Sequence, residues 1–274
     1  MQENSRNRIT TSIKAFVTGS LMTIPGVSGG SIAMVLGEYD NLIKAVPGLL
    51  KKSSFLKSVI YLAIFLVCAC LGIVIASKPV TYLMGHYPVP VMYFILGTII
   101  GSVPMIVKKA TLTKKSWPYA FCILIGMLVV YSIELLPQGI FNPTMDWSFS
   151  SIMIQLIGGV FISVGFILPG VSISYLLVVL GLYEPVFTLV GNMDILPLIP
   201  FGVGLVLGVF LLTGLVKTAM EKYPKATYMT ILGFLLSSMI PLFPGLPTGW
   251  NILSSLISFA FSTWAIYSIT SKGK

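Results

Sequence analysis

The chain has 274 residues, of which 56% are hydrophobic and only 9% are charged, and its mean hydropathy is +0.96. Soluble domains carry about 25% charged residues, so these few charges exclude a soluble globule of this size. The net charge is +9, and the basic residues lie between long apolar runs. This distribution favours contact with an anionic lipid surface and argues against a nucleic-acid partner.

The first apolar stretch, residues 13–37, follows a basic tail at residues 1–12. A basic segment before an apolar run is also typical of a signal peptide. Proline and glycines interrupt this run, however, and many apolar runs follow, so we expect no cleavage. The interruption at Pro25 and Gly26 instead predicts a broken helical segment.

Six further apolar runs have about the 20 residues that a helix needs to cross a bilayer. A second interrupted stretch, residues 151–181, lies between the third and fourth of these runs. It follows a linker at residues 137–149 that has no Lys or Arg, and we expect this linker outside the cell. The predicted spans are residues 58–77, 89–107, 117–136, 197–215, 226–243 and 251–270.

Basic residues predict the orientation, because cytoplasmic loops are enriched in Lys and Arg. Both flanks of the first broken stretch are basic, so it should enter and leave on the cytoplasmic side as a re-entrant hairpin. The second should be re-entrant from outside. This arrangement places 16 of 17 basic residues inside and only Lys78 outside (17 − 1 = 16). The inside residues are Arg6, Arg8, Lys14, Lys44, Lys51, Lys52, Lys57, Lys108, Lys109, Lys114, Lys115, Lys217, Lys222, Lys225, Lys272 and Lys274.

Both termini are therefore expected in the cytoplasm, with the chain crossing a plasma membrane several times. In the alternative arrangement both broken stretches span the membrane completely. That places the lysines of residues 44–57 opposite the basic N-terminus, which agrees less well with the charge rule.

The two halves of the sequence resemble each other. Pro25-Gly26-Val27-Ser28 recurs as Pro169-Gly170-Val171-Ser172, at an offset of 169 − 25 = 144. Later matches share an offset of 223 − 87 = 136, among them Tyr87-Pro88 with Tyr223-Pro224. The predicted fold is an all-α polytopic membrane protein of two repeats, residues 13–136 and 150–270. Each repeat is a re-entrant helical hairpin plus three transmembrane helices, and an odd number of spans makes the repeats inverted.

The broken segments predict an anion site. Helix starts leave backbone N–H groups without partners and carry a positive dipole end, which suits a phosphate when hydroxyl groups lie nearby. Two such starts, approaching from opposite faces, would meet near the midplane. The alternative is a kinked helix whose glycines only permit close packing. The candidate phosphate-binding residues are Gly26, Ser28, Gly29, Gly30, Ser31, Gly170, Ser172 and Ser174.

Few ionisable residues lie near the apolar interior. Glu38, Asp40, Glu184 and Lys78 are candidates for coupling to protons or cations, or for gating. The ordinary alternative is that they reach the interface from span ends. The single His86 excludes a multi-histidine metal site, and the three cysteines have no metal or disulfide spacing, so we expect no cofactor.

Two segments carry a resemblance to a known family. Pro25-Gly26-Val27-Ser28-Gly29-Gly30-Ser31 with Leu36-Gly37-Glu38-Tyr39, and Leu168-Pro169-Gly170-Val171-Ser172 with Leu180-Gly181-Leu182-Tyr183, resemble the bacterial undecaprenyl-phosphate (polyprenyl-phosphate) translocase family. The resemblance covers nearly the whole chain in span order, although the specific motifs occupy residues 16–46 and 158–190. Two residues depart from the family pattern. Thr23 stands where an acidic residue is frequent, and Ile173 stands where glycine is usual.

The resemblance implies a flippase that returns undecaprenyl phosphate from the outer to the cytoplasmic leaflet for cell-envelope synthesis. The two hairpin tips would clasp the phosphate, while the isoprenoid tail stays in lipid alongside. We expect the first tip to hold the phosphate more tightly, since it has Gly29-Gly30 where the second copy has Ile173-Ser174. The alternatives are a polyprenyl-pyrophosphate phosphatase, a transporter of small anions, and a structural scaffold. No arginine follows Ser28 and no Glu-x-x-x-Glu occurs, so we expect no enzyme activity.

Overall fold

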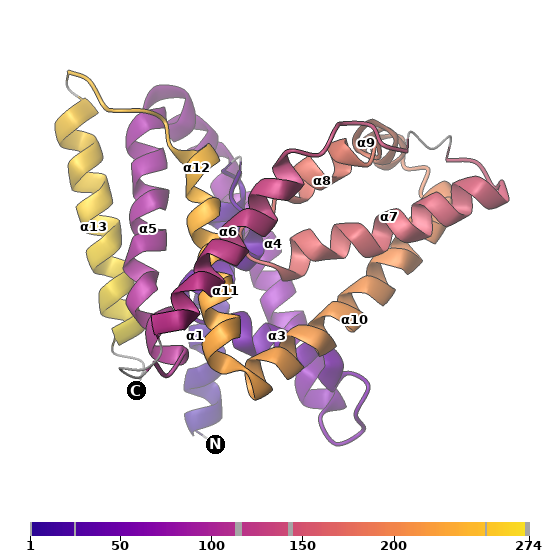
Figure 1. Ribbon diagram of the computed structural model, residues 1–274, viewed down its shortest axis with the longest axis horizontal. Coiled ribbons are helices and arrows are strands. Elements are labelled where there is room, and N and C mark those ends of the chain that lie inside the picture. The colour runs from indigo at the N-terminus through magenta and orange to yellow at the C-terminus, as the bar shows by residue number, and fades with distance from the viewer. Residues whose placement is uncertain (1, 25, 113–116, 142–144, 250, 272–274) are drawn as a thin grey trace.

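The computed structural model describes residues 2–24, 26–112, 117–141, 145–249 and 251–271. Pro25 and the orienting residues Lys114, Lys115, Lys272 and Lys274 lie outside the described residues. Within these ranges the chain is helical and contains no strand (Figure 1).

The described part of the first half contains six α-helices. They are α1 (Gln2–Met22), α2 (Gly29–Val35), α3 (Tyr39–Gly48), α4 (Phe55–His86), α5 (Pro88–Lys109) and, after the 3₁₀ turn η1 (Trp117–Tyr119), α6 (Ala120–Glu134). The second half repeats this order. Its elements are α7 (Phe149–Ile167), α8 (Ile173–Val179), α9 (Tyr183–Gly191), η2 (Leu196–Leu198), α10 (Ile199–Lys222), α11 (Pro224–Ser237), α12 (Met239–Leu242) and α13 (Asn251–Ser271).

The helix bounds follow the sequence offsets. α2 and α8 are related by 173 − 29 = 144 at their first residues, and α5 and α11 by 224 − 88 = 136. In each half, a long helix and two short helices therefore precede the remaining helices.

The two halves are interleaved. α1 packs on α4 and α7 on α10 within each half, whereas α5 packs on α13 and α6 on α11 across the halves. Glycines allow these close approaches at equivalent places. Gly72 lies against Phe16 of α1, and Gly208 lies against Val160 of α7. Across the halves, Gly97 lies against the Phe259 carbonyl and Gly233 against the Ile123 carbonyl, again at an offset of 136. Equivalent helices thus make equivalent contacts.

Among the described residues, six helical segments are long and apolar enough to cross a membrane, namely α4, α5, α7, η2–α10, α11–α12 and α13. The predicted run 58–77 is the middle of a 32-residue helix, and the run 226–243 is divided at Ser238 between α11 and α12. The run 117–136 forms only a 15-residue helix. Residues 2–12 of the basic tail are the first part of α1 and not a separate tail. Residues 39–48, which belong to no predicted span, form α3.

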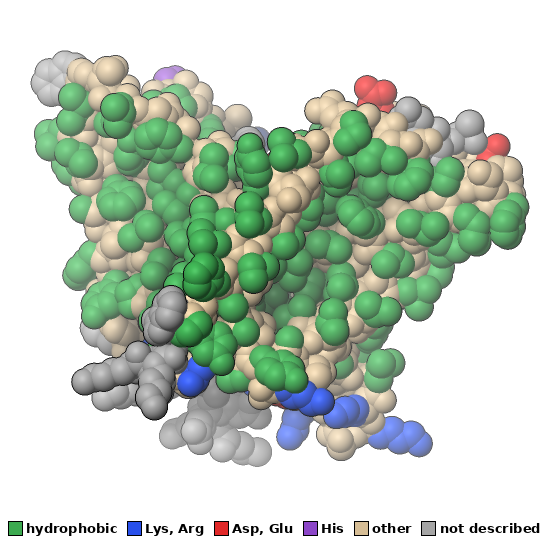
Figure 2. Space-filling view, viewed as in Figure 1, with side chains coloured by type: hydrophobic (Ala, Val, Ile, Leu, Met, Phe, Trp, Pro, Cys, Tyr) green, Lys and Arg blue, Asp and Glu red, His purple; other side chains and the backbone are tan. Residues whose placement is uncertain are grey.

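Charge divides the molecule into two ends. The N- and C-termini lie at the same end (Figure 1). Figure 2 shows Lys and Arg side chains along this edge, and Asp and Glu side chains at the opposite edge. The same face is hollowed at the acidic edge, between the lobe of α5 and α13 and the lobe of α7 to α9. Hydrophobic side chains cover the surface between the two ends, as expected for a lipid-facing belt.

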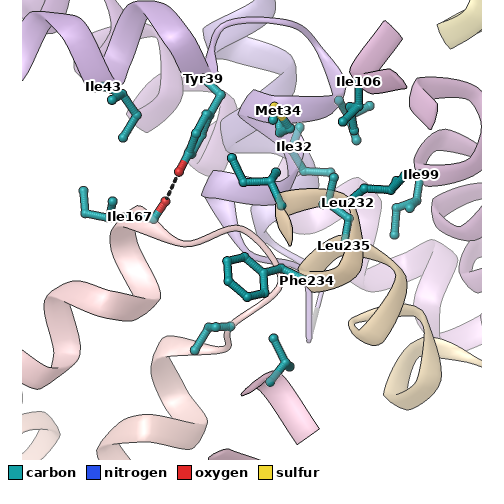
Figure 3. Close-up of a cluster of buried hydrophobic side chains, with 14 of the residues drawn as sticks. Ile32, Met34, Tyr39, Ile43, Ile99, Ile106, Ile167, Leu232, Phe234 and Leu235 are labelled. Carbon is teal, nitrogen blue, oxygen red and sulfur yellow. Dashed lines mark hydrogen bonds between the residues drawn. The ribbon is translucent and has the colours of Figure 1, made fainter. Parts of the chain in front are cut away.

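The core lies where the two halves meet. Ile32 and Met34 of α2 are buried with Ile99 of α5 and with Leu232 and Leu235 of α11 (Figure 3). The first broken segment is therefore held in the centre of the molecule by helices of both halves.

Candidate functional site

The first tip comprises the end of α1, the turn that follows it and the first three residues of α2, and Ser28 caps this helix. The Ser28 hydroxyl accepts a hydrogen bond from the Ser31 backbone N–H at 3.2 Å, and the two hydroxyls lie 2.7 Å apart. A serine at this position satisfies one of the N–H groups that a helix start leaves free. Gly26, with φ of +83°, makes the turn that precedes the cap.

The second tip, made of the end of α7, the turn that follows it and the first three residues of α8, has the same backbone form. Gly170 has φ of +89°, and the Ser172 hydroxyl caps α8 by accepting from the Tyr175 N–H at 3.4 Å. Its side chains differ from those of the first tip. The position of Ser31 is taken by Tyr175 (31 + 144 = 175), whose hydroxyl donates to the Glu134 carbonyl at 2.5 Å. The second tip therefore offers one hydroxyl where the first offers two.

The two tips touch. The Gly170 N–H donates to the Ser31 hydroxyl oxygen at 2.8 Å and lies 3.4 Å from the Ser28 hydroxyl oxygen. Beside this contact, the Tyr39 hydroxyl of α3 donates to the Ile167 carbonyl at the end of α7, at 2.8 Å (Figure 3). Ser28 is 8% and Ser31 is 4% exposed, so these hydroxyls are buried at the contact.

The structure brings only some of the predicted phosphate-binding residues together. Ser28, Ser31 and Gly170 form the contact, and Gly30 lies against Phe166 and Pro169 of the second tip. Ser174 is exposed on α8, and Gly26 is exposed on the turn before Ser28. Ser172 is half-buried and its hydroxyl bonds within its own tip.

Gly170 should tolerate no side chain. A methyl group there would overlap the Phe234 carbonyl of α11, and the positive φ adds strain. We expect Gly170→Ala to lower the free energy of unfolding in detergent by more than ~1 kcal/mol, because the overlap adds to the strain that a positive φ alone causes. Gly245→Ala is the control, because Gly245 has φ of +87° and open space around it. Equal melting temperatures for the two variants would contradict the close approach of the second tip to α11.

Glu38 lies between α2 and α3 and is 3% exposed. Its carboxylate accepts hydrogen bonds from Lys14 at 3.0 Å, Asn41 at 3.1 Å and the Tyr61 hydroxyl at 2.9 Å. A buried carboxylate requires such partners. Glu38 thus ties the start of α3 to α1 and α4.

Asp40 makes a second tie, to both halves. Its Oδ2 accepts from Lys109 of α5 at 2.8 Å and from the Tyr228 hydroxyl of α11 at 2.9 Å. The Lys109 ammonium also lies 5.9 Å from the centre of the Tyr228 ring. Sequence reasoning used Lys109 only as an orientation signal and missed Tyr228, because neither residue is near Asp40 in the chain.

The other two gating candidates lie apart from this network. Glu184, the counterpart of Asp40 (40 + 144 = 184), is exposed on α9. Lys78 is exposed on α4 and lines a shallow pocket with His86. Among the described residues neither side chain is in an ion pair. The described part of the chain also has no cluster of three or more His, Cys, Asp or Glu that could hold a metal.

Two polar cavities lie at the basic end, and Lys14 lines both. One, of about 510 Å³, also contains Glu38, Asn41 and Lys57. The other, of about 590 Å³, contains Lys108 and Lys109. A third cavity, of about 470 Å³, is apolar and begins at the glycines of the first tip.

Comparison with known proteins identifies the family of the chain. The undecaprenyl phosphate translocase-like family matches residues 18–255. A polyprenyl-phosphate transporter of Vibrio cholerae is 27% identical over 268 residues, covering 93% of this chain and 84% of that protein. A polyprenyl-phosphate transporter of Staphylococcus aureus is 30% identical over 258 residues, covering 90% and 89%. No solved structure matches. The family match includes both tips and most of the helices, and the chain therefore belongs to the undecaprenyl phosphate translocase-like family.

Proposed function

We propose that this protein carries undecaprenyl phosphate from the outer to the cytoplasmic leaflet of the bacterial plasma membrane, without chemistry on the phosphate. The observation that carries the proposal is the contact between the two tips, where Gly170 N–H meets the Ser31 hydroxyl. Two broken helices meeting between repeated halves are typical of secondary transporters. The names of the two relatives support a polyprenyl phosphate as the substrate.

The phosphate lies between the tips in this proposal. In the contact between the tips, the Gly170 N–H donates to the Ser31 hydroxyl oxygen. A phosphate oxygen that enters between them accepts from both groups, and a strong acceptor in a buried site makes that exchange favourable. Gly29 and Gly30 allow close approach at the first tip, whereas Ile173 narrows the second, so the first tip supplies most of the contacts.

The membrane orientation follows from the charge. With the basic end in the cytoplasm, both termini are cytoplasmic and the hollowed acidic edge faces outside. The α1–α2 hairpin then enters from the cytoplasm and α7–α8 from outside, which makes the halves inverted repeats. The equivalent glycine contacts of the two halves support this relation.

A difference between equivalent helices supports alternating access. α3 packs on α10 and buries Tyr39 and Ile43, each 2% exposed. The equivalent residues of α9, Tyr183 and Phe187, are 39% and 54% exposed, and α9 has no buried residue. Inverted repeats exchange their conformations when a transporter changes its open side. In the other state α9 therefore packs on α4, and α3 leaves α10.

The ties at Asp40 and Glu38 hold the basic end closed in this account. Asp40 joins α3 to α5 and α11, and Glu38 joins it to α1 and α4. Proton or cation binding at these carboxylates is the coupling step, since it releases the lysines and lets α3 move. The exposed Glu184 has no such tie to release.

Uptake of labelled undecaprenyl phosphate into proteoliposomes tests the proposal. Ser28→Ala and Gly29→Leu should both abolish uptake, because one removes a phosphate donor and the other fills the tip. Gly29→Leu should still fold, since its nearest neighbour is the flexible Met22 side chain. Ser132→Ala on the exposed face of α6 is the control and should behave as wild type. Wild-type uptake in both tip variants would refute the site.

Two further readouts separate the alternatives. Release of inorganic phosphate from undecaprenyl pyrophosphate by the purified protein would show an enzyme. Inhibition of the flux by free phosphate but not by unlabelled lipid phosphate would show a transporter of small anions. The proposal expects neither result.

A further inference from the structure

The apolar cavity of about 470 Å³ runs from Gly29 and Gly30 between the two halves. Helices α1, α3 and α4 form one wall, and α7, α8 and α10 form the other. Its rim reaches the membrane-facing surface at Leu66, which is 65% exposed, and at the exposed Cys70. The cavity thus connects the first tip with the lipid-facing side of the molecule.

The lining offers hydrocarbon contacts only. It contains no charged side chain, and its three hydroxyls already donate inside the protein. Thr18 donates to the Lys14 carbonyl at 2.8 Å, Thr213 to the Val209 carbonyl at 2.6 Å, and Tyr39 to the Ile167 carbonyl at 2.8 Å. An anionic ligand would find neither a positive charge nor a free hydroxyl donor along these walls, whereas a hydrocarbon chain fills them without loss.

Both halves supply equivalent residues to this cavity. Met22 and Phe166 face it at an offset of 144, as do Gly29 and Ile173, and Ile73 and Val209 face it at an offset of 136. The cavity therefore lies between the halves, along the line where the repeats meet. α3 extends it toward the basic end with Leu42 and Val46, but α9 makes no matching contribution.

We infer that this cavity binds the first isoprene units of the carrier lipid, with the phosphate at the tips. The inference rests on the proposed function. It places the isoprene units next to the phosphate inside the protein and not in the surrounding lipid. Its occupant has a polar group at the glycine end and branched hydrocarbon beyond it. Such a lipid, entering from the acidic edge, has its chain directed toward the basic end, as every outer-leaflet lipid does. The remainder of the chain leaves past Leu66 into the bilayer.

A matched pair of bulky substitutions tests the cavity. Leu66→Trp places an indole in the rim, whereas Val67→Trp places it beside the cavity, on a neighbouring residue that is 58% exposed and does not line it. Both positions face the surface, so both variants should fold. We expect Leu66→Trp to lower undecaprenyl phosphate uptake about tenfold, and Val67→Trp to leave it at the wild-type rate, since only the first fills the hydrocarbon path. Equal rates in the two variants would overturn the inference.

Photolabelling provides a readout that does not depend on transport. Undecaprenyl phosphate with a diazirine close to its phosphate end should label α4 between residues 62 and 73, and the labelled sites should be protected by excess unlabelled undecaprenyl phosphate. Labelling spread evenly over α4 and the lipid-facing α13, or equal protection by phosphatidic acid, would refute a polyprenyl site. Absence of wild-type uptake with protected labelling in the cavity would instead reject the proposed transport and retain the binding site.

Discussion

Asp40→Asn should lower uptake of undecaprenyl phosphate about tenfold, because a lost charge-assisted hydrogen bond is worth about 1.5–3 kcal/mol and a tenfold change needs about 1.4 kcal/mol. The substitution keeps an oxygen for Tyr228 but removes the charge that pairs with Lys109 at 2.8 Å. The tie between α3, α5 and α11 then weakens, and the closed basic end loses stability relative to the open one.

Glu184→Gln is the matched control for this prediction. Glu184 occupies the position equivalent to Asp40, but it is exposed, and Gly245 and Met92 stand where Lys109 and Tyr228 would have counterparts (109 + 136 = 245; 228 − 136 = 92). Uptake by the Glu184→Gln variant should stay within about twofold of wild type, because an exposed charge contributes little interaction energy. The exchange Asp40→Lys with Lys109→Asp should recover part of the activity. Similar loss in Asp40→Asn and Glu184→Gln, without recovery in the exchange, would contradict the tie.

Cross-linking α9 to α4 should stop transport almost completely. Ile43 of α3 and Thr213 of α10 line the same cavity, and their equivalents are Phe187 of α9 and Ser77 of α4 (43 + 144 = 187; 213 − 136 = 77). In a variant without native cysteines, Phe187→Cys with Ser77→Cys should be joined by a short bifunctional thiol reagent during turnover. A reducible reagent should restore uptake on reduction, because the joined state is one of the two that alternate.

The control for this pair uses the same helix. Ile75 is two residues from Ser77, which is a rotation of about 200° around α4, so the two side chains point to nearly opposite sides of the helix. Ile75 is 59% exposed, and Ile75→Cys therefore places its thiol on the lipid side. Phe187→Cys with Ile75→Cys should give no cross-link and normal uptake. Cross-linking of both pairs at one rate, or of neither, would show that α9 does not dock on this face of α4.

Local sequence features predicted much of the fold. Proline and glycine in two apolar runs located both breaks, and the offsets of 144 and 136 predicted that the halves share one helix order, which the structure has. α3 was missed because residues 39–48 are a short segment in which Asp40, Asn41 and Lys44 interrupt the apolar residues and Pro47 is near the end, so they resemble a loop. Burial against α10 and α4, rather than helix propensity, stabilises that helix.

The sequence predicted the local features of the candidate site but not its contacts between distant helices. Ser28 and Ser31 are three residues apart and share a helix face, so both reach the tip contact. Ser172 and Ser174 are two apart and point to different sides, and Tyr175 stands at the position of Ser31. That spacing could have been read from the sequence. The partners of Glu38 and Asp40 could not, because Tyr61, Lys109 and Tyr228 come near only through the packing of helices far apart in the chain.

The position of the phosphate of bound undecaprenyl phosphate, determined in a cryo-EM structure of the protein in lipid nanodiscs, tests the central claim most directly. The account predicts phosphate density between the tips, with the Ser28 and Ser31 hydroxyls and the Gly170 N–H directed at its oxygens. Phosphate held by Lys14, Lys108 and Lys109 in the basic-end cavity, with the contact between Ser31 and Gly170 unbroken, would contradict it.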